Sequence, residues 1–229
     1  MYAVAIDGPS GAGKSSISRA VAQKIGFIYV DTGALYRTVG LFLLKNGISP
    51  QDSEAVEAQL PKIQVEMRYA GEEQRMFLCG EDVSDAIRTD AVSYAASTAS
   101  KIPAVRAFLL DLQLQMAEKY NVIMDGRDIG TVILPHAQVK IFLTASAEER
   151  ADRRCKQLRE SGAEVEYDTI LKNIIERDAQ DMNRETAPLR AADDAVTLNT
   201  TGFEKEKSIA VITEIIQEKL RAYGFAFSD

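Results

Sequence analysis

The sequence predicts an α/β fold in which helices flank a five-stranded parallel sheet and a small antiparallel subdomain is inserted. Short apolar runs alternate with segments of helical periodicity at the start of the chain, which is typical of βαβ units. A glycine-rich turn links the first apolar run to the first helical segment. More than eighty residues then separate residues 37 and 121, whereas a crossover between parallel strands needs only about a dozen. That excess length predicts the inserted subdomain.

The first four elements follow one another without long loops. Residues 3–6 form an apolar run of strand length, and residues 14–25 have apolar positions on one helical face. Gly26 stands where a helix C-terminus favours glycine. Residues 27–30 predict the second strand and residues 34–45 the second helix.

The inserted segment has a different character. Residues 62–69 alternate apolar and polar side chains, residues 74–79 form a second β-like run, and residues 69–74 read as a hairpin turn. Two helical stretches follow at residues 90–100 and 104–119. We therefore expect a small antiparallel sheet with helices.

The α/β rhythm resumes after residue 121. The predicted strands are residues 122–124, 139–143 and 195–198, and the predicted helices are residues 147–160, 168–184 and 204–222. Together with the first two strands, they complete the five-stranded sheet.

The composition narrows the class of protein. The 229 residues are 46% hydrophobic and 27% charged, and the net charge of -7 argues against a general nucleic-acid binder. The sequence contains no apolar run of about 18 residues and no signal-peptide pattern, so we expect no membrane partner and a cytoplasmic location. Cys79 and Cys155 lie far apart and are expected to serve packing in a reducing compartment. A monomer is the default expectation.

The glycine-rich turn fits the phosphate-binding pattern G-x-x-x-x-G-K-[ST], with a strand before it and a helix after it. Glycines let backbone N–H groups surround a phosphate, and the helix N-terminus adds partial positive charge. None of the five asparagines is followed by lysine, so no guanine-reading N-K-x-D is present and ATP is favoured. The residues expected to bind ATP are Gly8, Pro9, Ser10, Gly11, Ala12, Gly13, Lys14, Ser15 and Ser16.

Two of these residues have particular roles in such a turn. Lys14 is expected to reach the β- and γ-phosphates, and the Ser15 hydroxyl to ligate Mg²⁺. Asp125 ends the third core strand, where an acidic residue would hold Mg²⁺ through water.

Polar clusters at strand ends are candidates for binding the phosphate acceptor, because ligands of parallel sheets bind at the carboxyl ends of strands. Arg37 lies one helical turn past the second strand and could hold an anion, or could be a surface arginine. Arg127 and Asp128 follow the third core strand, where burial is costly unless the charges are paired. A mutual Arg127–Asp128 ion pair that closes the turn is the alternative.

Two charged helices offer further candidates. Arg177, Asp181 and Arg184 have the spacing i, i+4 and i+7, which places them on one helical face, where they could bind a phosphate and a sugar or form an exposed ion pair. The helix with Arg150, Arg153 and Arg154 could simply face solvent, as charged helices usually do, or its arginines could close over the transferring group.

Five segments carry a resemblance to a known family. The segments "IDGPSGAGKSS", "DTGALYR", "GEDVSDAIRT", "MDGRDIGT" and "ERDAQDMNRETAPL" closely resemble bacterial cytidylate kinases, which are nucleoside-monophosphate kinases. The resemblance runs from residue 3 to about residue 200. It implies a P-loop NTPase-type core and phosphorylation of CMP and dCMP by ATP with Mg²⁺, in pyrimidine nucleotide metabolism. It also implies that the whole chain, residues 1–229, is one kinase domain.

The resemblance implies the domain's internal organisation. The core would comprise residues 1–37, 120–146 and 185–229, and the CMP-binding insertion would comprise residues 38–119. The lid would occupy about residues 147–167, followed by a helix at residues 168–184.

The resemblance also implies residue roles. The CMP-binding residues would be Thr32, Arg37, Ser97, Arg106, Arg127, Asp128, Arg177, Asp181 and Arg184. Among them, Asp181 would bond the sugar, and Ser97, Arg106 and Asp128 would read cytosine. Besides Lys14, the catalytic residues would be Arg127, Arg177 and Arg184, with Arg153 and Arg154 in the lid. Thr32 stands where some relatives have serine, which keeps the hydroxyl.

These roles agree with the chemistry of the acceptor. A carboxylate can accept a hydrogen bond from cytosine N4, whereas uracil has an oxygen at that position. A phosphate monoester with a second pKa near about 6 is already largely dianionic at pH 7, so no general base is needed. The alternatives are a kinase of another acceptor, such as UMP or a nucleoside, and a P-loop switch or binding module.

Overall fold

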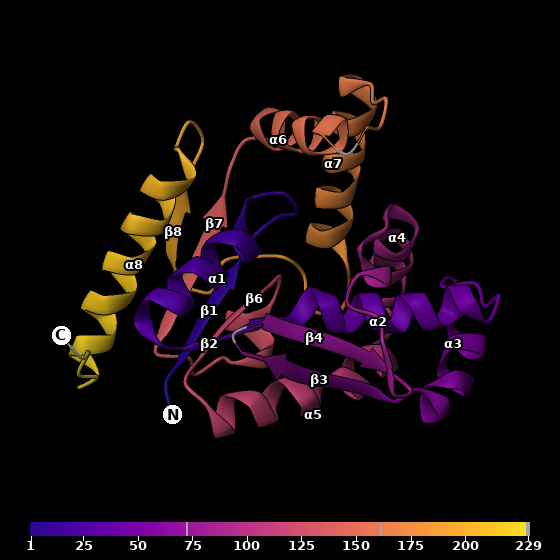
Figure 1. The fold of residues 1–229 in the computed structure, drawn as a ribbon, viewed down its shortest axis with the longest axis horizontal. Helices are drawn as coiled ribbons and strands as arrows, with labels where there is room; N and C mark the ends of the chain where they lie inside the picture. The colour runs from indigo at the N-terminus through magenta and orange to yellow at the C-terminus, as the bar shows by residue number, and fades with distance from the viewer. Residues whose placement is uncertain (72, 161, 228–229) are drawn as a thin grey trace. The chain divides into compact units, whose positions relative to one another are not determined.

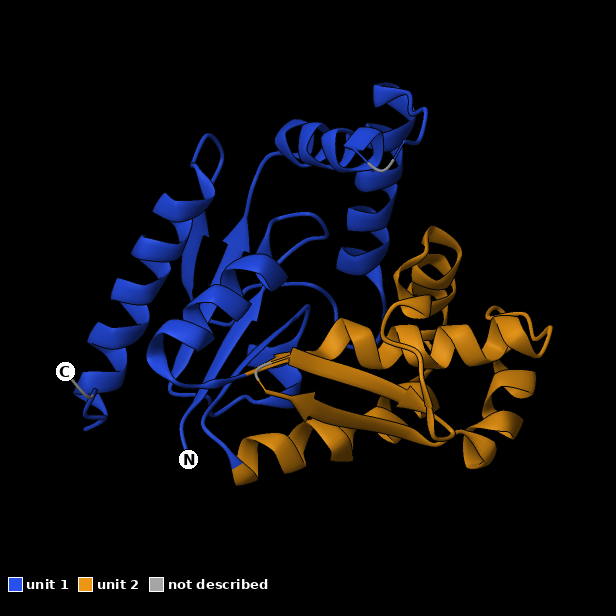
Figure 2. Cartoon of the chain, in the orientation of Figure 1, with its two compact units in different colours: residues 1–28, 120–229 blue, residues 29–119 orange. Residues whose placement is uncertain are grey.

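The computed structural model describes residues 1–71, 73–160 and 162–227. Its chain divides into two compact units, Met1–Ile28 with Tyr120–Asp229 and Tyr29–Lys119, shown in different colours in Figure 2. Glu72, in the predicted hairpin turn, and residue 161, in the predicted lid, lie outside the described residues.

The larger sheet has five strands in the order β2-β6-β1-β7-β8 (Figure 1). The strands are β1 (Ala3–Asp7), β2 (Ile28–Asp31), β6 (Val122–Gly126), β7 (Val139–Thr144) and β8 (Val196–Asn199). β1 pairs in parallel with β6 and β7, and β7 with β8. The predicted five-stranded parallel sheet is confirmed. Since β1 is central and buried, its near-continuous apolar run is what a strand covered on both faces requires.

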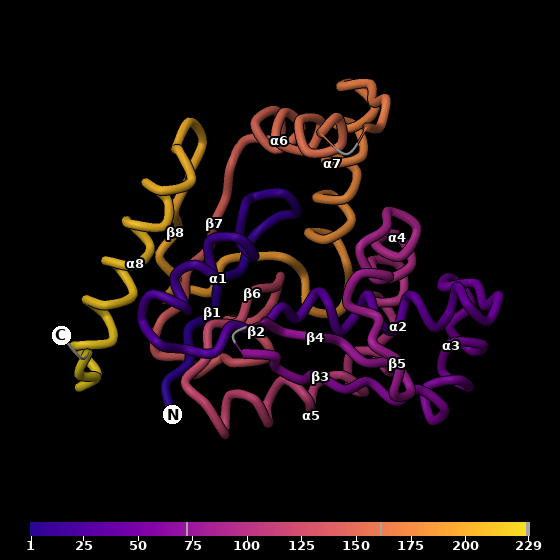
Figure 3. The backbone as a smooth tube through the Cα atoms, viewed as in Figure 1, coloured from indigo at the N-terminus to yellow at the C-terminus, as the bar shows by residue number. Residues whose placement is uncertain are grey.

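The first unit contains four long helices. α1 (Lys14–Ile25) and α8 (Lys205–Ala222) pack against each other, and α6 (Ala147–Glu160) packs against α7 (Tyr167–Asn183). The tube in Figure 3 shows α1 following the turn after β1. α1 ends at Gly26, whose φ of 72° is a left-handed conformation that glycine adopts without strain.

A single π-helical turn, η3 (Ile129–Ile133), follows β6 in the first unit. The amides of Ile133 and Leu134 bond to carbonyls five residues earlier, at Asp128 and Ile129. Such turns are rare and often occur at functional sites, and this one directly follows the predicted Arg127–Asp128 cluster.

The second unit contains a three-stranded antiparallel sheet, β3 (Val65–Ala70), β4 (Glu73–Leu78) and β5 (Glu81–Asp82). β3 and β4 form the predicted hairpin, in which Val65 lies opposite Leu78 and Tyr69 opposite Gln74. The unit's helical segments are α2 (Thr32–Lys45), α3 (Ser53–Gln59), η1 (Leu60–Lys62), η2 (Ala86–Arg88), α4 (Asp90–Ala99) and α5 (Pro103–Lys119).

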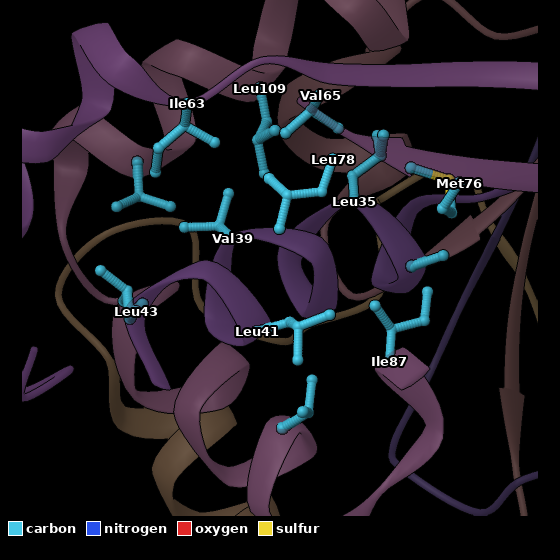
Figure 4. Close-up of a cluster of buried hydrophobic side chains, with 14 of the residues drawn as sticks. Leu35, Val39, Leu41, Leu43, Ile63, Val65, Met76, Leu78, Ile87 and Leu109 are labelled. Carbon is cyan, nitrogen blue, oxygen red and sulfur yellow. The ribbon is translucent and has the colours of Figure 1, made fainter. Parts of the chain in front are cut away.

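The core of the second unit lies between this sheet and helix α2 (Figure 4). Alternate residues of β4, Met76 and Leu78, point into it because successive side chains of a strand face opposite sides. Leu35 and Val39 lie one turn apart on α2 and are fully buried. Gly40 lets α2 approach α4 closely, since a Cβ there would lie 2.8 Å from Ala96 N.

Several details differ from the sequence predictions. The seven-residue helix α3 was not predicted, because a helix with one buried residue, Val56, has little apolar periodicity. Cys155 is buried as expected, but Cys79 is exposed, so a packing role for Cys79 was wrong. In the described part of the chain, no helix has both the length and the apolar character to cross a membrane.

Candidate functional site

The glycine-rich turn joins β1 to α1 in the first unit. Gly8 has a φ of 149°, and a Cβ at this position would lie 1.9 Å from the backbone oxygen of Leu143 in β7. Gly11 and Gly13 also have positive φ values, 76° and 87°. Glycine adopts these conformations without strain, and at Gly8 it also leaves room for the backbone of β7, so the glycines of the motif follow from the geometry of the turn.

Lys14 lies against its own loop. Its ammonium group donates to the carbonyl oxygen of Pro9 at 2.8 Å, and the side chain is buried. Burial lowers the pKa of Lys14 to about 7, with a further lowering by Arg127 that is opposed by Asp125, Asp7 and Asp181. A phosphate group bound beside the ammonium would favour its charged form.

Ser15 and Asp125 are close, as the predicted metal site requires. The Ser15 hydroxyl donates to Asp125 Oδ2 at 2.8 Å, and Asp125 is buried at the end of β6. A hydroxyl and a carboxylate are oxygen ligands of the kind Mg²⁺ prefers, and Mg²⁺ is usually held by one or two protein groups together with substrate phosphates and water. Among the described residues, no cluster of three or more His, Cys, Asp or Glu side chains could hold a metal by itself. The Ser15 hydroxyl and the Asp125 carboxylate are donors that fit a nucleotide-bound Mg²⁺.

Asp7 connects this turn to the segment after β6. Its carboxylate accepts hydrogen bonds from the amides of Ile129 and Gly130 at 2.8 and 2.7 Å, at the start of η3. Burial raises the pKa of Asp7 to about 6, although the two amides oppose the rise. Asp7 was not predicted as a site residue, although an acidic residue at the end of a buried strand could have indicated one.

Arg127 and Asp128 are each paired with a residue from the end of α7 or just beyond it. Arg127 Nε donates to Asp181 Oδ2 at 2.9 Å, and Arg184 donates to Asp128 Oδ1 at 3.2 Å. The mutual Arg127–Asp128 pair considered from the sequence is thus replaced by two pairs that join two segments of the first unit. Burial would raise the pKa of Asp181, but Arg127, Arg177 and Arg184 together hold it below its ordinary value.

Arg184 does not lie on the helical face that its spacing predicted. α7 ends at Asn183, and Arg184 has extended backbone angles of φ -66° and ψ 140°. Its Nε donates to the carbonyl of Ala187, which has a positive φ of 51°. The turn after α7, and not helical periodicity, therefore directs Arg184 to Asp128.

The three arginines of α6 differ in their surroundings. Arg150 is buried, pairs with Asp178 of α7 and donates to the Ser10 carbonyl of the glycine-rich turn at 2.9 Å. This contact holds α6 and α7 against the turn, whereas the sequence had suggested that Arg150 closes over the transferring group.

The other two arginines are more exposed. Arg153 pairs with Glu149 at 2.9 Å, and Arg154 donates to Gln157 at 3.1 Å. The Arg153 guanidinium also lies near Gly13, since a Cβ on that glycine would be 3.8 Å from Nη1.

Thr32 and Arg37 belong to the second unit, at the start of α2. Asp31 caps this helix by accepting from Ala34 N at 2.9 Å, and its other oxygen accepts from Arg37 at 2.8 Å. Thr32 is buried, while the Arg37 side chain keeps 24% of its surface exposed. Arg37 is therefore anchored by a carboxylate on its own helix terminus.

Ser97 and Arg106 lie on α4 and α5 of the same unit. Arg106 is buried, donates to the Ser100 carbonyl at 3.5 Å and stacks 5.7 Å from the centre of the Tyr36 ring. Ser97 is half-buried, and its carbonyl accepts from the Ser100 hydroxyl. Both residues are thus linked to Ser100.

Comparison with known proteins identifies relatives along nearly the whole chain. The chain is 46% identical over 218 residues to a cytidylate kinase of Caldicellulosiruptor bescii, covering 95% of this chain and 96% of that protein. It is 42% identical over 218 residues to the cytidylate kinase of Bacillus subtilis, covering 95% and 97% of the two chains.

Among solved structures, an uncharacterized protein from Eubacterium ventriosum shares the fold at a TM-score of 0.53 and 11% identity, over 95% of this chain and 99% of that one. A sequence model of the cytidylate kinase family matches residues 4–220. This match and the two relatives show that the chain belongs to the cytidylate kinase family.

Proposed function

We propose that this chain transfers the γ-phosphoryl group of ATP to CMP and dCMP, giving ADP with CDP or dCDP. Family membership supports this reaction. In the structure, the carrying observation is the pair of ion pairs in the first unit, Arg127–Asp181 and Arg184–Asp128. These pairs bring together two arginines, which suit a phosphate, and two carboxylates, which suit a sugar hydroxyl and the amino group of cytosine.

The turn between β1 and α1 binds the donor. Backbone N–H groups of residues 10–15 surround the ATP phosphates, and Lys14 neutralises charge between the β- and γ-phosphates. The Ser15 hydroxyl would hold Mg²⁺ directly, and Asp125 would hold it through water. When bound, Mg²⁺ supplies charge neutralisation on the donor phosphates.

The acceptor requires alignment more than activation. The CMP phosphate is largely dianionic at neutral pH, so it attacks without a general base once it lies in line with the donor phosphate. Arg127, Arg177 and Arg184 offset the repulsion between the two anions, and Arg37 of the second unit adds a further cation. Arg153 and Arg154 stabilise the transferring group from α6. Fixed guanidinium groups do this well because their partners have already oriented them.

Recognition of the nucleoside follows from hydrogen-bond polarity. Asp128 accepts from cytosine N4, Arg106 donates to the ring acceptors, Ser97 and Thr32 contribute hydroxyls, and Asp181 bonds the sugar. UMP would place an oxygen against Asp128, so the hydrogen bond from the base would be lost and two acceptors would face each other, at a cost of about 1–3 kcal/mol. We expect CMP to be preferred over UMP by roughly ten- to a hundredfold.

An acceptor panel tests this function. ADP release is measured with CMP, dCMP, UMP, AMP and cytidine at equal concentrations, with ATP and Mg²⁺. CMP and dCMP should be the best acceptors, and cytidine should give no turnover because it lacks the attacking phosphate. Preference for cytidine would indicate a nucleoside kinase, and ADP release without any acceptor would indicate a switch or binding module.

We further propose that the enzyme acts as a cytoplasmic monomer. Both cysteines are free thiols, which suits a reducing compartment. Light scattering coupled to size exclusion measures the oligomeric state, and a dimer mass would overturn this part of the proposal.

A further inference from the structure

Two side chains of the β3–β4 hairpin form hydrogen bonds with backbone groups at the outer edge of β2. In an extended strand, the backbone groups of alternate residues point to opposite edges. Ile28 N bonds Asn121 O at 2.8 Å, so the backbone groups of Tyr29 and Asp31 point away from β6. β2 is the first strand of the sheet, so backbone N–H and C=O groups at this edge need hydrogen-bond partners from outside the sheet.

Gln74 of β4 satisfies Asp31 at that edge. Its Oε1 accepts from Asp31 N at 2.8 Å, and its Nε2 donates to Asp31 O at 3.3 Å. A primary amide carries one acceptor and one donor group, so it matches both backbone groups of a single residue. Gln74 is only 8% exposed, and a buried amide is costly unless its bonds are made.

Tyr69 of β3 satisfies the same edge two residues earlier. Its hydroxyl donates to Tyr29 O at 2.9 Å. Tyr69 and Gln74 are directly opposite each other in the hairpin. The two side chains together therefore take the place of a neighbouring strand along β2.

The residue fixed in this way is the one that holds Arg37. Asp31 caps α2 through one carboxylate oxygen and pairs with Arg37 through the other. A Cβ on Gly33 would lie 3.0 Å from Arg37 Nη1, so the guanidinium runs close along the helix start. A shift of the Asp31 backbone would move both the cap and the guanidinium.

We propose that Gln74 and Tyr69 are positioning residues that set the orientation of Arg37 toward the CMP phosphate through Asp31. The inference rests on the proposed role of Arg37 in CMP binding. The β3–β4 hairpin thus contributes to acceptor binding through three hydrogen bonds to the backbone of β2.

The test compares steady-state kinetics of Gln74→Met, Tyr69→Phe and Arg37→Ala. Gln74→Met keeps the size of the side chain and removes both bonds to Asp31, so KM for CMP should rise about tenfold. Tyr69→Phe removes one bond and should raise it about threefold. KM for ATP and kcat should stay within about twofold of wild type, which general damage to the fold would not allow.

Two control variants make the same residue changes elsewhere in the unit, at buried Gln113 and at exposed Tyr94. Gln113→Met removes a buried amide whose Nε2 bonds Leu109 O within α5, and Tyr94→Phe removes a hydroxyl that contacts Gln51. Both should leave KM for CMP within about twofold of wild type. A rise equal to that of Gln74→Met or Tyr69→Phe would overturn the proposal, because any loss of such a bond would then have the same effect.

The Arg37→Ala background separates this inference from the proposed function. If Gln74 acts through Arg37, adding Gln74→Met to Arg37→Ala should raise KM for CMP by less than twofold. An undiminished tenfold rise would overturn the positioning role. An unchanged KM in Arg37→Ala alone would instead remove Arg37 from CMP binding, and the inference with it. Should Gln74→Met fail to fold, Tyr69→Phe decides, and an unchanged KM in that variant overturns the proposal.

Discussion

At the scale of single residues, close backbone approach decides which positions tolerate change. Gly8 illustrates this, because a Cβ would overlap the Leu143 carbonyl of β7 at 1.9 Å. Gly26 also has a positive φ of 72°, but no atom lies within 4 Å of its Cβ position. Comparing substitutions at the two glycines therefore distinguishes the effect of a backbone clash, at Gly8, from the effect of conformational strain alone, at Gly26.

We expect Gly8→Ala to abolish ATP binding, because the turn must move away from β7 to relieve the clash. Gly26→Ala should cost only about 1–2 kcal/mol of stability and leave ATP binding unchanged. Calorimetric titration with ATP and thermal unfolding of both variants make the comparison. Wild-type ATP affinity in Gly8→Ala would contradict the geometry described for the turn.

Residue types could be predicted from the sequence, whereas their partners could not. The motif located Lys14 and Ser15, and strand ends located Arg127 and Asp128. The partners Asp181 and Arg184 come from a distant segment, and only the folded chain brings them to Arg127 and Asp128. Arg150 shows the same limit, because a buried contact with the Ser10 carbonyl leaves no local pattern in the sequence.

At the scale of elements, periodicity predicted the long helices and the buried strands but not the short or irregular segments. The π-helical turn η3 depends on Asp7, more than a hundred residues earlier, which accepts from its first amides. Arg184 was placed on a helix that ends one residue before it. Helix ends depend on local capping and tertiary contacts, to which periodicity is insensitive.

The end of β5 provides a pH prediction. The Ser84 hydroxyl and amide, with a smaller contribution from Arg75, lower the pKa of Asp82 from 3.8 to about 2. The folded state therefore binds fewer protons than the unfolded state between about pH 2 and 4. The stabilisation from Asp82 is present above pH 4 and is lost as the pH falls toward 2.

We expect Asp82→Asn to be less stable than wild type at pH 6 and to approach wild-type stability near pH 2.5. Urea unfolding at the two pH values measures the difference. A difference that does not change with pH would show that Asp82 contributes through packing and not through its charge.

At the scale of the whole molecule, the glycine-rich turn and a cluster of aromatic rings lie at opposite ends of β1. Asp7 and the glycine-rich turn are at its carboxyl end, whereas Tyr2 precedes its amino end. There Phe225 packs edge-on against Tyr2, Phe27 and Phe227, with ring centres 4.7 to 5.3 Å apart. This cluster joins the two ends of the chain within the first unit.

Phe225→Ala should therefore lower stability by about 1–3 kcal/mol through the loss of these ring contacts. Its kcat and KM values for CMP and ATP at 25 °C should stay at wild-type level, because the cluster lies away from the glycine-rich turn. Thermal unfolding and steady-state kinetics test both parts. A large loss of activity in the folded variant would contradict this separation.

The class of the whole molecule was predictable because its motifs are long and occur in order. The α/β architecture and membership of the cytidylate kinase family were both confirmed. The roles of individual residues in CMP binding remain predictions, since they concern contacts with substrates. The domain boundaries remain predictions as well, since the lid and the insertion are defined by how segments move.

The most direct measurement is the ratio of kcat/KM for CMP to that for UMP, in wild type and in Asp128→Ala. We predict that the ratio falls by roughly tenfold or more in the variant, because the carboxylate proposed to accept from cytosine N4 is gone. KM for ATP should change far less. An unchanged ratio would contradict the account, since Asp128 would then have no part in reading the base.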